Sequence, residues 1–562
     1  MYILGISNSM DSNVALLKDG ELIFAAGEER FSRVKQDDSF PQRALDAALL
    51  FAGIALDDID VVAYGWHKGF PEEHLKAYVQ RCIDIEATGK EAKDIMDQRI
   101  QIEAERSLAR RADFDRRMEE LGLSDRVEYF DHHVSHAATA YYPSPFEEAL
   151  VITLDAAGDY RSGTVSVGKG NSLTEVSCNF TFDGLGFLYG QITELLGFKP
   201  HRHEGKVTGL AAFGDPKPCL PIMQKMVEVK DGKIYGLLHE YFKPFFYEQK
   251  ESLKAALKPH TREEIAAALQ KHLEDVVTEY ILYYVQKHEI GNIACSGGIF
   301  ANVKMNQRIR ALKGVTDLYV FPQMNDGGLA VGAAILSSLQ HGEFRKRPTS
   351  MYLGPASTNE EVEQIAKKYG DKVTLTAFSH DDLVMKTVEL IEKNTVVGLF
   401  QGRMEYGPRA LGNRTVLYHA KDRSVNDWLN TRLRRTEFMP FAPVTTMELA
   451  PQCFLGWNPS HVTTKWMTEC YDVTEELKTN APAIVHVDGT ARPQIIARED
   501  NPFYYDVITA WHKKTGGLCL INTSFNEHEE PIVCTIEDAV ESMLGDNVDC
   551  LVVNGKYLIN KR

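Results

Sequence analysis

The chain has 562 residues, of which 44% are hydrophobic and 25% charged, and its 62 basic and 79 acidic residues give a formal net charge of −17. The length predicts three or four domains of ordinary size, or two large ones, and the composition excludes global disorder and fibrous repeats. The acidity argues against a general nucleic-acid or acidic-membrane binder, because such proteins need a positive surface.

The N-terminal sequence MYILGISNSMDSN has neither a basic leader nor a long apolar run, and no stretch reaches the length of a membrane span. The nine cysteines are scattered without a C-x-x-C pair, which is typical of reduced, mostly buried thiols and excludes a zinc ribbon. We therefore expect a soluble cytoplasmic protein with no membrane partner.

Three strand-like runs open the chain, at residues 2–7, 13–20 and 21–32. A helical stretch follows at 41–53, and a further strand at 60–66. The Asp19-Gly20 pair predicts a tight hairpin. Residues 149–180 repeat the order of strand, acidic turn, strand, glycine-rich turn and strand, and Asp11 and Asp155 each fall just past the first strand of their copy. This duplication is typical of an actin-like α/β fold, whose two related halves face each other. Two unrelated three-stranded meanders are the alternative.

Two segments interrupt this pattern. Residues 67–125 form a polar block with mixed charges at helical spacing, which predicts a solvated helical excursion. A dimer contact or a substrate lid is the alternative interpretation. The proline-broken segment 341–359 predicts a linker, so we expect one domain over 1–345 and a second α/β domain over 346–562.

A candidate metal site follows the strand-like sequence RVEYF. His132 and His136 are four residues apart, so on a helix both imidazoles project from one face, whereas His133 points elsewhere. A polar helix face is the alternative. Asp155 follows on the next strand, and Asp326 lies between a strand and a glycine-rich helix start. Two histidines and two carboxylates suit Fe(II), Mn(II) or Zn(II).

Glycine-containing turns in the same half predict a ligand cleft. Backbone amides at a glycine turn before a helix can approach an anion, although each motif alone could be a plain turn. The candidate nucleotide-binding residues of this half are Glu204, Lys206, Gly297, Gly298 and Asn302.

Residues 402–435 contain seven arginines and one lysine against three acidic residues, a net charge of +5. The arginines stand among glycine, proline and apolar residues, where guanidinium groups can bind phosphate in a bidentate manner. A solvated basic surface is the alternative. Later turns add Arg492, Ser524 and Asn526.

Several segments together resemble the carbamoyltransferase family, typified by nodulation, tobramycin, cephamycin and ansamycin O-carbamoyltransferases: HHVSHAATAYYPSPF, EGKVTGLAAFG, GPRALGNR, FMPFAP, HVDGTARPQ and NTSFNEHEEPIVCT. The resemblance spans nearly the whole chain except residues 67–125. It implies an actin-like, Kae1-like N-terminal domain and a smaller YrdC-like C-terminal domain. It also implies two steps: ATP and carbamoyl phosphate give carbamoyl-adenylate, and the carbamoyl group then moves to a hydroxyl of a small-molecule natural product.

The resemblance assigns roles to individual residues. It implies a metal site, with Fe²⁺ as the first choice and Mn²⁺ or Zn²⁺ as alternatives, at His132, His136, Asp155 and Asp326. ATP would bind with Mg²⁺. It implies nucleotide and carbamoyl phosphate contacts at Arg409, Arg492, Ser524 and Asn526, and a basic contact at either Arg434 or Arg435. To these the basic segment adds Arg403 and Arg414. The partners expected are these small molecules, no nucleic acid, and a second copy of the chain as a homodimer.

The chain departs from the family pattern at its first turn. The family has a histidine before Asp-Ser, a base for the acceptor hydroxyl, where this chain has Met10. A thioether cannot take a proton, so Asp11, His133 or a metal-held hydroxide would serve, or the acceptor would be acidic enough without a base. The family also commonly has arginine in place of Met439.

The alternatives are an actin-fold kinase or RNA-modification factor, and a non-catalytic relative that lost its base at Met10. The S-x-N and GPRALGNR motifs argue against a simple kinase, and the charge of −17 argues against a tRNA partner.

Overall fold

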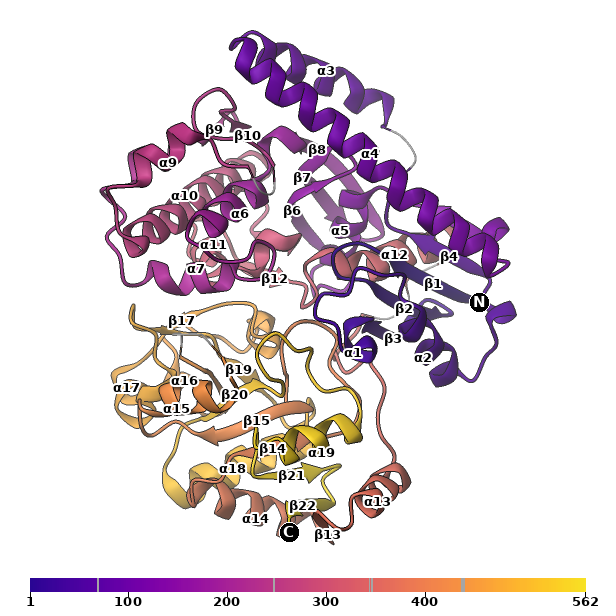
Figure 1. Ribbon diagram of the computed structural model, residues 1–562, viewed down its shortest axis with the longest axis vertical. Coiled ribbons are helices and arrows are strands. Elements are labelled where there is room, and N and C mark those ends of the chain that lie inside the picture. The colour runs from indigo at the N-terminus through magenta and orange to yellow at the C-terminus, as the bar shows by residue number, and fades with distance from the viewer. Residues whose placement is uncertain (68–69, 246–247, 343, 345–346, 436–439) are drawn as a thin grey trace. The chain divides into compact units, whose positions relative to one another are not determined.

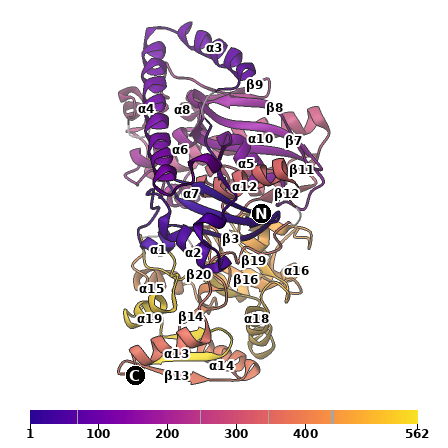
Figure 2. The ribbon, with the colours of Figure 1, turned by 90° about the vertical axis from the view of Figure 1, so that its right-hand side faces the viewer.

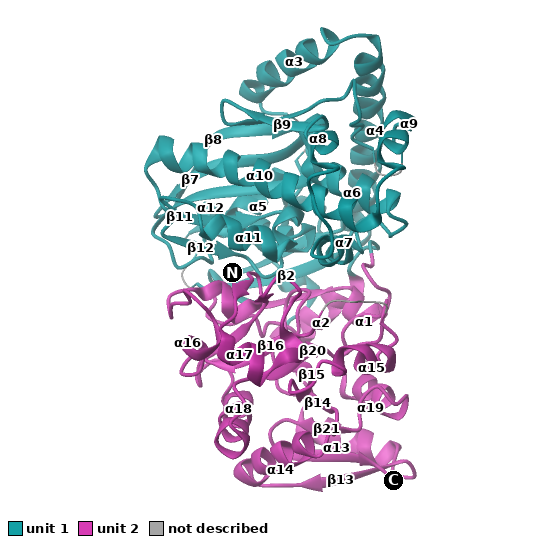
Figure 3. Ribbon diagram, turned by 90° about the vertical axis from the view of Figure 1, so that its left-hand side faces the viewer, with its two compact units in different colours: residues 1–23, 38–41, 54–347 teal, residues 24–37, 42–53, 348–562 magenta. Residues whose placement is uncertain are grey.

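The computed structural model describes residues 1–67, 70–245, 248–342, 344, 347–435 and 440–562, so Met439 lies outside the described residues. The chain forms two compact units (Figure 3). The first unit comprises residues 1–23, 38–41 and 54–347, and the second comprises 24–37, 42–53 and 348–562.

The first unit is built on two five-stranded sheets with the same topology. The first sheet has the order β3-β2-β1-β4-β5, with β1 (Tyr2–Ser7), β2 (Asn13–Lys18), β3 (Glu21–Gly27), β4 (Val61–Tyr64) and β5 (Val127–Tyr129). The second has the order β8-β7-β6-β11-β12, with β6 (Glu148–Gly158), β7 (Arg161–Lys169), β8 (Ser172–Phe180), β11 (Asn292–Ser296) and β12 (Asp317–Val320). In each sheet the first strand pairs antiparallel with the second and parallel with the fourth. The duplication predicted from the sequence is therefore present in the strand topology.

Local sequence explains the first hairpin and one difference from prediction. Asp19 and Gly20 have φ of +49° and +78°, the left-handed pair that a tight two-residue hairpin requires. The run at 21–32 is not one strand, because β3 ends at Gly27 and α1 (Glu29–Ser32) follows. Asp155 lies within β6 and not beyond it, at an irregularity between Leu154 and Gly158 where the register with β7 shifts. Such bulges re-aim side chains.

Two helices connect the sheets. The helix α5 (His132–Tyr141) packs on β6, β7 and β11, whereas α12 (Leu329–His341) packs on β1, β2 and β4. The two helices also pack against each other, as Figure 2 lets the reader follow. Both helices follow the last strand of a sheet, so their N-terminal ends begin at equivalent places in the duplicated topology.

Other elements of the first unit flank this framework: α3 (Glu72–Glu86), α4 (Lys90–Glu120), α6 (Leu185–Leu195), α7 (Glu204–Ala211), α8 (Leu220–Met223), β9 (Val227–Lys230), β10 (Lys233–Gly236), α9 (Glu251–Leu257), α10 (Arg262–His288) and α11 (Val303–Arg310). The helices α3 and α4 lie side by side (Figure 1). One face of α4 is buried, including Arg99, Glu103 and Phe114. The predicted solvated excursion therefore describes only the outer face of this block.

The second unit contains one mixed sheet of eight strands in the order β13-β22-β21-β14-β15-β20-β16-β19. Its strands are β13 (Val373–Ala377), β14 (Val397–Phe400), β15 (Arg414–His419), β16 (Ala442–Thr446), β19 (Gln494–Ile496), β20 (Leu520–Ser524), β21 (Cys550–Val553) and β22 (Tyr557–Lys561). A two-stranded sheet pairs β17 (Tyr471–Asp472) with β18 (Thr490–Ala491). Besides α1, its α-helices in the described residues are α2 (Gln42–Ala52), α13 (Asn359–Lys368), α14 (His380–Glu392), α15 (Val425–Arg432), α16 (Ala450–Cys453), α17 (Glu475–Asn480), α18 (Pro502–Thr515) and α19 (Ile536–Leu544).

The boundary between the units falls between Arg347 and Pro348, within the segment expected to be a linker. Residues 24–37 and 42–53 belong to the second unit, although the sequence analysis placed all of 1–345 in one domain. No helix in the described part of the chain is long and apolar enough to cross a membrane.

Candidate functional site

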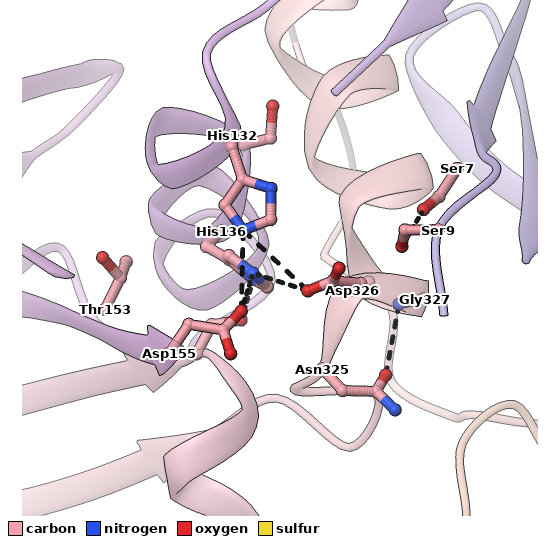
Figure 4. A network of polar contacts seen from close by, with 12 residues as sticks. Ser7, Ser9, His132, His136, Thr153, Asp155, Asn325, Asp326 and Gly327 are labelled. Atoms are coloured by element: carbon pink, nitrogen blue, oxygen red, sulfur yellow. Dashed lines mark hydrogen bonds and ion pairs between the residues drawn. The ribbon is translucent and has the colours of Figure 1, made fainter. Parts of the chain in front are cut away.

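The four predicted metal ligands meet in the first unit (Figure 4). His132 and His136 come from α5, Asp155 from β6, and Asp326 from the turn before α12. One ligand atom of each residue lies within 4.8 Å of the others. The Nε2 atoms of the two histidines lie 3.5 and 3.4 Å from Asp155 Oδ2, and 3.8 and 3.6 Å from Asp326 Oδ1.

Local structure explains why both imidazoles point to the same place. Asp131 caps α5 by accepting a hydrogen bond from the Val134 amide at 2.9 Å, so the helix begins at His132 and the i, i+4 spacing aligns the rings. Gly158 gives the His132 ring its room, because a Cβ at this position would lie 2.2 Å from the ring atom Cδ2.

The orientation of His136 leaves its Nε2 available to a cation. Its Nδ1 lies 3.1 Å from Ser296 Oγ, and that hydroxyl donates to the carbonyl of Met324 at 3.2 Å. Because the hydroxyl proton is committed to Met324, the neutral form of His136 carries its hydrogen on Nδ1 and its lone pair on Nε2. Within the described residues, the Nε2 atoms of His132 and His136 are buried without a hydrogen-bond partner.

The charges of the cluster also fit a cation. Burial alone would lower the pKa of His136, but the carboxylates of Asp155 and Asp326 outweigh it and raise that pKa to about 9. Burial would raise the pKa of Asp155, but His132 and His136 hold it well below its usual range. Two imidazoles and two carboxylates converging in a buried place are a donor set for a divalent transition metal.

Asp11 supports the turn that carries Asp326. Its Oδ2 accepts hydrogen bonds from Gln323 Nε2 at 2.8 Å and from Asn325 Nδ2 at 3.0 Å. The neighbouring Met10 is 39% exposed. Asp11 itself is half-buried, so a carboxylate that contacts the residue before Asp326 retains some exposure to solvent.

His133, the other predicted base, faces away from the cluster. Its Nδ1 lies 2.9 Å from Thr153 Oγ1, which in turn lies 2.8 Å from Thr164 Oγ1. The ring is fully buried, and burial together with the charges of His132 and Arg161 keeps its pKa well below the usual value. His133 is therefore a neutral ring fixed to the strands beneath α5.

The glycine turns predicted to bind a nucleotide lie close to the cluster. A Cβ at Gly298 would lie 3.2 Å from Asp155 Oδ1, and Gly297 has φ of +106° with backbone of Leu154 too close for any side chain. Glu204 begins α7, accepts from the His201 amide, and has its pKa raised by burial. Lys206 lies on the same helix and is 7% exposed.

Asn302 has a structural partner. It caps α11 and exchanges hydrogen bonds with Gln270 on α10, at 2.7 and 3.2 Å. Gln270 also accepts from the hydroxyl of Tyr189 at 3.0 Å. This network joins α6, α10 and α11 behind the glycine turns.

The helical block reaches the metal cluster through an aromatic ring. The guanidinium of Arg110 on α4 lies 4.0 Å from the centroid of Trp66, and the Trp66 ring lies 4.3 Å from the ring of His132. Farther along α4, Glu103 accepts from the Tyr160 amide at 2.9 Å. The block thus contributes to the wall around a metal ligand.

In the second unit, three motifs that are distant in sequence meet. Asn522 on β20 donates to the carbonyl of Ala410 at 3.0 Å and to Gln494 Oε1 at 2.7 Å. Gln494 on β19 in turn donates to the carbonyl of Leu411 at 2.8 Å. The motifs GPRALGNR, HVDGTARPQ and NTSFN therefore share one hydrogen-bond network.

At the edge of this network, Arg435 binds the S-x-N motif. Its guanidinium donates to Ser524 Oγ at 3.0 Å, to Asn526 Oδ1 at 2.9 Å and to Thr523 Oγ1 at 2.6 Å. Arg434 has φ of +53°, is 69% exposed, and pairs with Glu527 at 3.0 Å. Of the two arginines that the sequence left open, Arg435 is the one next to Ser524 and Asn526.

Two of the predicted anion ligands are instead engaged with the protein. Arg414 is fully buried, stacks on Phe400 at 3.7 Å and donates to the carbonyl of Gln401 at 2.7 Å. Arg403 donates to the carbonyls of Leu353 and Gly354. Burial lowers the pKa of each to about 10. The fully buried Arg414 guanidinium is held by backbone carbonyls and is not presented to a ligand, which corrects its predicted role, whereas Arg403 is half-buried and its role as an anion ligand stays a prediction.

Arg409 and Arg492 have a different environment. Both are half-buried, Arg409 in the loop between β14 and β15 and Arg492 between β18 and β19. Arg403 is half-buried too, so of these arginines only Arg414 has lost its contact with solvent.

The sequence matches two family models. The model described as carbamoyltransferase N-terminus matches residues 2–335, and the one described as carbamoyltransferase C-terminus matches 388–561. This chain belongs to the carbamoyltransferase family. It is similar to nodulation protein NolNO of Sinorhizobium fredii, with 32% identity over 98% of this chain and 79% of that protein. An uncharacterized protein of Methanocaldococcus jannaschii is 31% identical over 100% of this chain and 99% of that protein.

A solved structure, HypF of T. kodakarensis, matches with 13% identity and a TM-score of 0.31, over 60% of this chain and 47% of that chain. A likeness this weak carries no argument about function.

Sequence reasoning missed one charged residue of this carbamoyltransferase. Glu405 is 2% exposed, and its Oε1 accepts the backbone amides of Leu411, Asn413 and Arg414 at 2.9, 2.7 and 2.9 Å. The glycine-rich loop therefore encloses a carboxylate of the protein itself. The available signal was an acid standing alone among the arginines of 402–414.

Proposed function

We propose that this carbamoyltransferase is an ATP-dependent O-carbamoyltransferase that takes the carbamoyl group from carbamoyl phosphate and forms carbamoyl-adenylate on the way. Water releases phosphate from carbamoyl phosphate to give carbamate, and carbamate displaces pyrophosphate from ATP. The acceptor hydroxyl then displaces AMP and loses its proton. The acceptor is a hydroxyl of a small-molecule natural product.

One observation carries the proposal: each unit holds its own cluster of chemical groups. The first unit has a buried cluster of two histidines and two carboxylates, and the second has arginine, serine and asparagine around three loop motifs. A reaction with an activation step and a transfer step needs two such places. The first unit would be the actin-like, Kae1-like transfer domain and the second the YrdC-like adenylate-forming domain.

In the activation step, Arg409, Arg435 and Arg492 would bind the anionic substrates. Arg435 is held by Ser524 and Asn526, which fixes its guanidinium fork before a phosphate arrives. Ser524 and Asn526 also hydrogen-bond to each other at 2.6 Å, and they would exchange this bond for one to the substrate. ATP would bring Mg²⁺ with it.

In the transfer step, His132, His136, Asp155 and Asp326 would hold a divalent metal, with Fe²⁺ preferred over Mn²⁺ and Zn²⁺. When bound, such an ion polarises a carbonyl as a Lewis acid. Glu204, Lys206, Gly297 and Gly298 would line the nucleotide portion of the adenylate, and Asn302 would hold the turn beside them.

Asp11 would accept the proton of the acceptor hydroxyl. It is half-buried and accepts hydrogen bonds from Gln323 and from Asn325, the residue before Asp326. His133 is the weaker candidate, because its ring is sealed against Thr153. The wall made by Arg110 and Trp66 supports a role of residues 67–125 in choosing the acceptor.

ATP–pyrophosphate exchange tests the proposal. Labelled pyrophosphate should enter ATP only when carbamoyl phosphate is present, and AMP should accumulate only when an acceptor is added. Absence of carbamoyl phosphate-dependent exchange and of pyrophosphate release would refute the activation step. Mass spectrometry of candidate hydroxyl compounds, screened for a carbamoyl mass gain, identifies the acceptor.

The family assignment favours this function over the actin-fold kinase, the RNA-modification factor and the non-catalytic relative. Elemental analysis of the purified protein would identify the metal.

A further inference from the structure

Residues 24–37 and 42–53 form a segment that we call the arm, which comes from the N-terminal part of the chain and packs within the second unit. The amide of Ala25 donates to the carbonyl of Leu353 at 3.2 Å. On α2, the ring of Phe51 lies 4.3 Å from the guanidinium of Arg403, the same side chain that holds Leu353 and Gly354. The arm is therefore anchored at the start of the second unit's own chain segment.

Two arginines of the arm reach the loops of the proposed adenylate-forming site. Arg30 is 5% exposed, and its Nη2 donates to the carbonyl of Gly407 at 2.7 Å. Gly407 stands two residues before Arg409 in the loop between β14 and β15. The buried guanidinium thus holds the loop that carries a proposed phosphate ligand.

Arg33 holds the second loop by a bidentate contact. Its Nη1 and Nη2 donate to the carbonyls of Ile532 and Pro531 at 2.7 and 2.8 Å. The preceding residue, Glu530, accepts from Asn526 Nδ2 at 2.7 Å. The contact therefore lies one residue from the partner that orients the S-x-N asparagine.

Acidic residues of the arm hold Arg30 and join the two helices of the arm. Glu29 is buried and pairs with Arg30 at 3.5 Å and with Lys35 at 3.1 Å. Glu28 accepts the amides of Arg43 and Ala44 at 3.2 and 2.8 Å, which joins α1 to the start of α2. The arm is therefore held together by its own hydrogen bonds and ion pairs.

We propose that the arm completes the adenylate-forming site, with Arg30 and Arg33 as positioning residues for the loops 405–414 and 524–533. The proposal rests on the proposed function, because it assigns these loops to carbamoyl phosphate and ATP. Neither loop has helix or strand structure over most of its length, so side-chain donors must fix its carbonyls. An element encoded before residue 54 would thus set the geometry of a site encoded after residue 400.

The test compares Arg30→Met and Arg33→Met with Arg43→Met in the full-length protein. Arg43 is a matched control, because it lies in the arm but its guanidinium donates to the arm's own Phe31 carbonyl at 3.0 Å. Each charged hydrogen bond lost to a loop should raise KM for ATP and carbamoyl phosphate in pyrophosphate exchange about ten- to hundredfold. Melting temperature should match that of Arg43→Met, and Arg33→Lys should recover part of the loss.

Hydrogen–deuterium exchange separates this inference from the proposed function. Amides of 405–414 should exchange faster in Arg30→Met, and those of 524–533 faster in Arg33→Met, each relative to Arg43→Met. If all three variants show the same amide protection and the same KM for ATP and carbamoyl phosphate, the arm has no positioning role. If the wild-type protein shows no carbamoyl phosphate-dependent pyrophosphate exchange, the proposed function fails. The amide protection of the two loops then decides the role of the arm by itself.

Discussion

The two candidate sites differ in how their polar groups are satisfied. In the metal cluster, the Nε2 atoms of His132 and His136 are buried without hydrogen-bond partners among the described residues, so the cluster is organised around something that the chain does not supply. In the loop network of the second unit, the protein itself supplies the hydrogen-bond partners. Glu405 accepts hydrogen bonds from three backbone amides, and the side-chain oxygen of Asn526 accepts them from Ser524 and Arg435.

On the proposed function, the first site is preformed for a resident ion, whereas the polar groups of the second are paired with one another until a substrate replaces those contacts. The ligand atoms of a resident ion have no other partner in the protein. Leaving such buried polar atoms unpaired costs free energy, and binding of the ion removes that cost. A transient anion needs a loop that keeps its shape in the anion's absence. The predictions below test this difference.

The largest effect is expected for His136→Ala. Loss of one imidazole should remove the metal and lower transfer to acceptor by about 1,000-fold or more, because the Lewis acid is lost. Pyrophosphate exchange should stay at the wild-type rate. The reciprocal variant Arg409→Ala should abolish exchange and keep the metal content. Equal loss of exchange in both variants would contradict the division into two sites.

Asp11→Asn comes next. Asparagine keeps an oxygen that can accept from Gln323 and Asn325 but is no longer a base, so transfer should fall about 100-fold with metal content unchanged. Single-turnover transfer from preformed adenylate measures this step. A rate within twofold of the wild type would exclude Asp11 as the proton acceptor.

Arg435→Met should lower kcat/KM of pyrophosphate exchange by about 10- to 100-fold, because a fixed guanidinium fork is lost beside Ser524 and Asn526. The adjacent Arg434→Met is the control. Its exposed ion pair with Glu527 contributes little, so exchange should change less than about twofold. A reversal of this order would mean that the wrong arginine had been assigned.

The smallest effect is expected for Glu405→Gln. A neutral amide accepts the three backbone hydrogens less strongly than a carboxylate, which should cost the second unit about 1–3 kcal/mol of unfolding free energy. Urea denaturation followed by a probe in each unit should locate the loss in the second unit. An unchanged midpoint there would show that the loop keeps its shape without this charge.

Much of the metal cluster was predictable, because its signals are local. The i, i+4 spacing of His132 and His136 fixed their shared face, and the strand that follows α5 and the turn before α12 brought Asp155 and Asp326 near. The choice between Arg434 and Arg435 was not predictable, since it depends on a left-handed backbone at Arg434 that no residue type requires.

Tertiary contacts account for what the sequence did not reveal. The sequence predicts Arg414 to be an anion ligand, and only its burial against Phe400 shows otherwise. The sequence of α2 indicates a helix but not the core that it covers, so residues 24–37 and 42–53 were expected to remain with the first unit.

The equal topology of the two sheets in the first unit presents several positions twice. His132 and Asp326 each follow the last strand of a sheet at the start of a helix, Asp11 follows the first strand of its sheet, and Asp155 lies near the end of the first strand of the other. One copy of the acidic turn joins the metal cluster and the other binds Gln323 and Asn325. The repeated strand order therefore does not extend to the side chains: one acidic turn supplies a member of the four-residue cluster, and the other supports the loop that carries a second member.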